Sequence, residues 1–76
     1  MFECDQFLDA SGLTCPMPLL KMKQSLNTMS VGDVLYVITT DKSSARDFGV
    51  FLKQAGHMLV EQNEVDKRYH FWIKKG

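Results

Sequence analysis

GLTCPMPLL, residues 12–20, is the stretch of this sequence that decides its fold, because it fixes where the first helix begins. Proline suits the first helical position, since its φ is already helical and that position needs no N–H partner. Pro16 is therefore predicted to open the helix, which puts Cys15 at the N-cap, where Ser, Thr, Asp or Asn usually stands. Pro18 adds a second residue without an N–H to the same first turn.

A cysteine at this place has a functional and a structural interpretation. The backbone N–H groups of Met17 and Leu19, together with the positive end of the helix dipole, favour an anion beside the sulfur. We therefore expect the pKa of the Cys15 thiol to lie below the ordinary value of about 8.5, which would make it a reactive nucleophile. The alternative is a buried and inert cysteine that happens to precede a helix. The two prolines favour the functional interpretation.

The composition restricts the class of protein. A chain of 76 residues has room for one domain with a small core, predicted over residues 1–76, and its 45% hydrophobic content excludes disorder. Nine basic and nine acidic side chains cancel, which argues against direct binding of nucleic acid. Two cysteines form no disulfide framework. The acidic first nine residues lack the features of a signal peptide, and no apolar run reaches membrane-spanning length. We expect a cytoplasmic protein without a membrane partner.

The hydrophobic periodicity and the turn residues predict six elements. The strands are expected at residues 6–9, 34–40, 57–62 and 68–74, and the helices from Pro16 to Ser30 and from Ser43 or Ser44 to Gly56. Residues 63–67 are expected to form a polar turn. Because residues 34–40 are apolar at nearly every position, this strand is predicted to be buried on both faces. The fold class is α/β: a two-layer α/β sandwich of order βαβαββ, with two helices on one face of a mixed four-stranded sheet.

This topology brings two segments together. If the first two strands are parallel, both helices begin at the carboxyl ends of their preceding strands, on the same edge of the sheet. Cys15 and residues 41–44 are therefore expected to share one rim of the molecule.

Several short motifs along the chain resemble the signature of the TusA/SirA-like family of small sulfur carriers. The principal one is Leu8-Asp9-Ala10 followed by Gly12-Leu13-x-Cys15-Pro16-x-Pro18. Later landmarks of the family have counterparts in Gly32-Asp33, Thr40-Asp41, Arg46-Asp47 and Gly56-His57. The resemblance covers essentially the whole chain in order and length.

The resemblance implies a sulfurtransferase-type relay that needs no cofactor, whether or not it counts as an enzyme. The carrier cysteine, here Cys15, would accept a sulfane sulfur from a donor such as a cysteine desulfurase. It would hold the sulfur as a persulfide and pass it to an acceptor protein. Asp41 matches an acidic position associated with transfer, and Lys23 and Arg46 match basic positions that face partners. The pathways served by the family include tRNA thiolation, molybdenum-enzyme maturation, sulfur oxidation and selenium metabolism.

Three residues depart from the family pattern. Thr14 stands where many members have arginine, Met17 where the residue is often acidic, and Asn27 where it is frequently basic. These differences concern the identity of the partners and leave the chemistry of Cys15 unchanged.

Other residues keep alternative interpretations. Asp41 could simply cap the second helix. Cys4 could resolve an oxidised Cys15 or be incidental. His57 and His70 lack the close ligand spacing of a zinc site, so no metal is expected. The rival functions are a small RNA-binding module and a thiol-redox regulatory module, and we expect a monomer.

Overall fold

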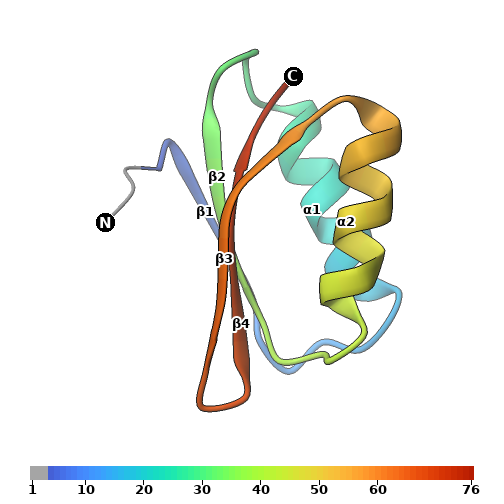
Figure 1. Ribbon diagram of the computed structural model, residues 1–76. Coiled ribbons are helices and arrows are strands. Elements are labelled where there is room, and N and C mark those ends of the chain that lie inside the picture. The colour runs from blue at the N-terminus through green and yellow to red at the C-terminus, as the bar shows by residue number, and fades with distance from the viewer. Residues whose placement is uncertain (1–3) are drawn as a thin grey trace.

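The computed structural model describes residues 4–76. Its elements follow the predicted order βαβαββ, and Figure 1 shows both helices on one side of the sheet. Their bounds are β1 (Gln6–Ala10), α1 (Met17–Asn27), β2 (Val34–Thr39), α2 (Ser44–Ala55), β3 (Met58–Val65) and β4 (Arg68–Lys74). The two-layer α/β sandwich predicted from the sequence is confirmed. Within residues 4–76, neither helix has the length and apolar character that crossing a membrane requires.

The sheet is mixed, as predicted, with the strand order β1-β2-β4-β3. β1 runs parallel to β2, with Gln6 opposite Leu35 and Ala10 opposite Thr39. The pairs β2–β4 and β3–β4 are antiparallel. Since β1 and β2 are parallel, the loops that lead into α1 and α2 leave the sheet at the same end (Figure 1).

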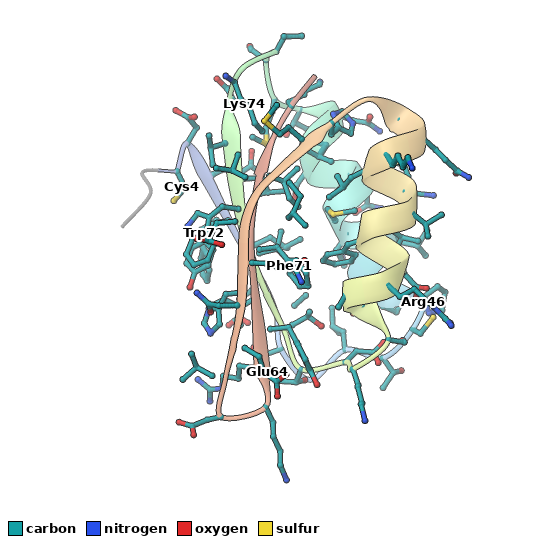
Figure 2. All side chains as sticks on the ribbon, in the orientation of Figure 1. Cys4, Arg46, Glu64, Phe71, Trp72 and Lys74 are labelled. Carbon is teal, nitrogen blue, oxygen red and sulfur yellow. The ribbon has the colours of Figure 1, made fainter. Side chains whose placement is uncertain are left out.

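The core lies between the sheet and the helices. In β2 and β4 every second side chain faces the helices, as the period of a strand requires; all of these are buried except Tyr69, which is half-buried. Phe71 of β4 points into this layer (Figure 2) and meets Phe48 of α2, with 4.8 Å between the ring centroids. The other buried apolar side chains are Ala10, Met22, Leu26, Met29, Leu35, Val37, Leu52 and Ile73.

The opposite face of the sheet is open, so the prediction that residues 34–40 are buried on both faces is wrong. Phe7, Tyr36 and Trp72 stand at paired positions of β1, β2 and β4 on this face. The Tyr36 ring centroid is 5.2 Å from that of Phe7 and 4.6 Å from that of Trp72. Cross-strand aromatic pairs of this kind stabilise a sheet and cover each other. The apolar residues of β2 on this side are therefore half-buried without any second layer.

A polar turn was predicted at residues 63–67, and the turn that the structure contains is shorter. β3 continues to Val65, and the turn consists of Asp66 and Lys67, with φ of 51° and 64°. Two left-handed residues make the tight turn that matches the twist of a β-hairpin. β3 is an edge strand, and polar residues on an edge protect it from pairing with other chains. This explains why its second half carries no hydrophobic signal.

Candidate functional site

The loops before α1 and α2 meet at one rim of the molecule, as the topology predicted. The backbone N–H of Gly12 donates to Oγ1 of Thr40 at 2.8 Å, which ties the first loop to the second. Ser43 is the N-cap residue of α2, one of the two positions predicted, although its hydroxyl donates to Asp41 and makes no capping hydrogen bond. Cys15 and Asp41 therefore stand on the same rim, on loops that contact each other.

Cys15 is exposed and lies one residue outside the helix cap. The N-cap of α1 is Pro16, with φ of −97° and ψ of 13°, and the Cys15–Pro16 peptide bond is cis. The carbonyl of Pro16 accepts the N–H of Leu20 at 3.1 Å, which is the first bond of the helix. The prediction that Cys15 is the cap is therefore wrong. The N–H of Met17 donates to the carbonyl of Thr14 at 2.8 Å, so this donor is engaged away from the sulfur.

Asp47 is a residue of this rim that the sequence analysis did not single out as a candidate site residue. The Cys15 thiol donates to its carboxylate, with 3.6 Å between Sγ and Oδ2. Asp47 lies in the first turn of α2 and is half-buried. It was noted only as part of the motif Arg46-Asp47. The available signal was the shared rim, since two helices that begin there bring their first turns close to each other.

These contacts raise the pKa of the Cys15 thiol above its ordinary value, so the prediction of a lowered pKa is wrong. The largest cause is a loss of hydration at the sulfur, followed by the hydrogen bond to Asp47, which favours the protonated form, and by the charge of that carboxylate. Ser43 acts in the opposite direction, and the charge of Asp41 adds a small further increase. The sequence predicted a positive field that favours an anion at the sulfur, whereas the structure places two carboxylates there.

Asp41 shapes the entrance of α2. Its Oδ1 accepts the backbone N–H of Ser43 at 3.2 Å and the hydroxyl of Ser43 at 3.0 Å. Its own N–H donates to Oγ1 of Thr39 at 3.1 Å. The structural interpretation of Asp41 is thus supported, because its side chain fixes the loop in which Ser43 stands. Its charge also acts on the Cys15 thiol, so a role of Asp41 in sulfur transfer stays a prediction.

Lys23 and Arg46 border two different hollows, one shared with Asp47 and the other with Asp41. Lys23 lines a groove of about 250 Å³ between α1 and α2 together with Asp47, and its Nζ lies 4.8 Å from the centroid of the Phe51 ring. Arg46 borders a shallow hollow with Asp41 and Ser43, and Figure 2 shows it on the outer side of α2. Within residues 4–76 neither cation forms an ion pair, so both are available to a partner.

Cys4 does not belong to this rim. It precedes β1, whereas Cys15 follows it, and a five-residue strand separates the two ends by roughly 17 Å. Figure 2 shows Cys4 on the open side of the sheet, and it contributes, after loss of hydration, to the raised pKa of Tyr36. A disulfide requires Cα atoms within about 7 Å, so the two cysteines are out of reach of each other. The described residues contain no cluster of three or more potential metal ligands.

The raised pKa gives a direct prediction for the reactivity of Cys15. In a Cys4→Ser variant, which leaves one thiol, we expect the pH midpoint of alkylation to lie above the ordinary value of about 8.5. At pH 7 the thiolate fraction should be smaller than the few per cent of a free cysteine, with correspondingly slow alkylation. The measurement is the rate of iodoacetamide modification between pH 6 and pH 11, followed by mass. A midpoint at or below that of a free cysteine would contradict the electrostatics described above.

The geometry alone does not say which family the chain belongs to, and comparison with known families does. The family described as Sulfurtransferase TusA matches this chain over residues 6–75. The chain belongs to the TusA family. The TusA/SirA-like resemblance inferred from the Cys-Pro-x-Pro region is thereby confirmed.

Individual relatives agree with this assignment. The sulfur carrier protein TusA of Allochromatium vinosum is 53% identical over 75 residues, covering 99% of each chain. The sulfur carrier protein TusA of Pseudomonas aeruginosa is 42% identical over 71 residues, covering 93% of this chain and 90% of the relative. A crystal structure of a SirA-like protein from Desulfitobacterium hafniense superimposes with a TM-score of 0.83 at 25% identity, covering 93% and 97% of the two chains. The TusA family is one of sulfur carriers, which implies a sulfur donor and a sulfur acceptor as partners.

Proposed function

We propose that Cys15 receives a sulfane sulfur from a donor protein, carries it as a persulfide and delivers it to an acceptor protein. The observation that supports this most is the exposed sulfur of Cys15 on the rim, within the Cys-Pro-x-Pro element of a TusA-family chain. A relay must meet two different proteins in turn, and an exposed sulfur on a protruding loop is accessible to both.

The transfer is an exchange at sulfur. The Cys15 thiolate attacks the outer sulfur of the donor's persulfide; a new S–S bond forms on Cys15, and the S–S bond of the donor breaks. The electron pair of the broken bond stays on the donor's cysteine, which takes up the proton that Cys15 has released. Delivery is the same reaction with the acceptor thiol as nucleophile. No redox partner, metal or cofactor enters this balance.

The residues around Cys15 support transient docking. Lys23 and Arg46 offer two cations without an ion pair in the described part of the chain, which suits an acidic surface on the partner. Met17 and Leu20 are large apolar side chains of α1 that remain 40% and 42% exposed. Because donor and acceptor must use the same sulfur, their docking sites overlap and each contact must be transient, which favours a monomeric carrier. A cysteine desulfurase is the proposed donor.

The two rival functions lose support. Redox regulation through Cys4 and Cys15 would require the two thiols to approach across the length of β1. Base recognition would require free aromatic faces on the open side of the sheet. There the Tyr36 and Trp72 rings stack on each other, with an interplanar angle of 5°, and so cover one face of each ring.

The test is loading by a donor. Wild type and Cys4→Ser are incubated with a cysteine desulfurase and cysteine, and both should gain one sulfur atom that a reductant removes. The Cys4→Ser variant is needed because trypsin cleaves after Lys and Arg and leaves both cysteines in one peptide, residues 1–21. A small-molecule persulfide serves as a second donor. The absence of an adduct with both donors would refute the proposal.

A further inference from the structure

We propose that Asp47 disfavours the sulfur-loaded state of Cys15, so that the carrier gives up its sulfur more readily than a cysteine without this neighbour would. The inference rests on the proposed function, since it concerns the persulfide on Cys15. It assigns to Asp47 a role in setting the equilibrium between the loaded and the free carrier.

The contact that carries the inference is the hydrogen bond between the Cys15 thiol and Oδ2 of Asp47, at 3.6 Å. This bond needs the proton on sulfur, because a carboxylate only accepts. It therefore exists in the free carrier and is lost when the sulfur is loaded. Asp47 is half-buried in the first turn of α2, which holds its carboxylate close to the sulfur.

The loaded state brings like charges together. A hydropersulfide is a stronger acid than a thiol, so the loaded carrier ends in an anionic sulfur at neutral pH. The charged groups that face Cys15 from the second loop and α2 are Asp41 and Asp47, both acidic. The first turn of α1, residues 17–20, contains no charged residue that could offset these two carboxylates. Loading thus replaces a hydrogen bond with a repulsion.

No cation offsets this repulsion in the described residues. Lys23 lines the same groove as Asp47, yet its Nζ lies over the Phe51 ring, and Arg46 borders the hollow on the other side. Among residues 4–76 neither of them forms an ion pair with Asp47. The charge of Asp47 therefore acts on the sulfur, screened only by solvent.

The experiment measures a loading equilibrium directly. Carriers in the Cys4→Ser background are equilibrated with fixed amounts of glutathione persulfide and glutathione, and the ratio of loaded to free protein is read by intact mass. In this exchange the outer sulfur moves from glutathione persulfide to Cys15, and the proton of the Cys15 thiol ends on glutathione. The variants are Asp47→Asn, which removes the charge, and Asp47→Glu, which keeps it. Glu61→Gln is the matched control, since Glu61 pairs with Trp72 on the open face of the sheet.

Asp47→Asn is expected to raise the ratio of loaded to free carrier about three- to tenfold, the size expected for one charge a few ångström away near the surface. Asp47→Glu and Glu61→Gln should stay within about twofold of the parent. The gain from Asp47→Asn should shrink at high ionic strength, which a purely structural role would not produce. If Asp47→Asn fails to fold, Asp47→Ser replaces it, because serine is also tolerated in a first helical turn.

An unchanged or lowered ratio for Asp47→Asn, with the parent loading normally, would overturn the inference and leave the proposed function intact. An equal rise of the loaded-to-free ratio in Glu61→Gln would also overturn the inference, because the change would then follow from the net charge of the protein and not from the position of Asp47. A parent that forms no adduct with any donor would overturn both proposals.

Discussion

Cys15→Ser is expected to lose sulfur loading and transfer down to the background of the assay while keeping its fold. The serine hydroxyl is not deprotonated at neutral pH and cannot hold a persulfide, so no residual transfer is expected. The cost in stability should be small, because Cys15 is exposed, lies outside α1, and interacts through its side chain only with the polar groups of Asp47 and Ser43. Surface substitutions of this kind change the free energy of unfolding by about 0.5 kcal/mol or less.

The measurement combines intact mass after incubation with a desulfurase and a urea unfolding curve for each variant. Cys4→Ser is the matched control, since it removes the other exposed thiol from the opposite end of β1. We expect it to load within about twofold of wild type, because Cys4 does not approach the rim. Loading that persists in Cys15→Ser and disappears in Cys4→Ser would show that Cys4 carries the sulfur, and would refute the role proposed for Cys15.

The fold was predictable because its signals are local and mutually consistent. The periodicity of Met22 and Leu26, and the glycine at position 56 in the left-handed conformation, mark the two helices without ambiguity. Two strands joined by a helix pair in parallel, and this places Cys15 and Asp41 on one rim. The placement of Cys15 and Asp41 on one rim thus followed from the topology alone.

The errors arose where a pairwise tertiary contact decides the outcome. The field of a helix N-terminus at Cys15 was inferred from sequence spacing alone. Loss of hydration at the sulfur, followed by the contact with Asp47, which is 32 positions away in the sequence, instead raises the pKa of the Cys15 thiol. No local pattern reports which of the residues of α2 faces the sulfur. The raised pKa of Cys15 is therefore a property of how the loop before α1 packs against the first turn of α2.

The length of the turn between β3 and β4 was mispredicted for a different reason. Residues 62–64 are polar because they lie on an edge strand, and a polar run reads as a loop when the sheet order is unknown. Neither Asp66 nor Lys67 is a glycine, so the usual mark of a two-residue turn was missing. Similarly, the apolar sequence of β2 suggested that a layer of structure covers each face of this strand. On the open face, the aromatic rings of neighbouring strands cover it instead.

Phe48→Ala is expected to be the most destabilising single change in the chain. Phe48 is fully buried, and its ring lies against Phe71, where α2 meets the sheet. Removing a buried phenylalanine costs about 3–5 kcal/mol, since the transfer free energy is lost and a cavity remains. At roughly 0.05–0.15 kcal/mol per residue, a domain of this size has about 4–11 kcal/mol in total. The variant should therefore lose a large fraction of the free energy of unfolding of this domain.

The unfolding midpoint in urea measures this loss, and Val50→Ala in the same helix is the control. Val50 is 53% exposed, so its truncation should change the free energy of unfolding by less than about 1 kcal/mol. A loss below about 1 kcal/mol for Phe48→Ala would mean that α2 is not held by this contact. The result also bears on Cys15, because Asp47 directly precedes Phe48 in α2. As α2 detaches, the carboxylate leaves the sulfur, and the pKa of Cys15 should fall toward that of an ordinary cysteine.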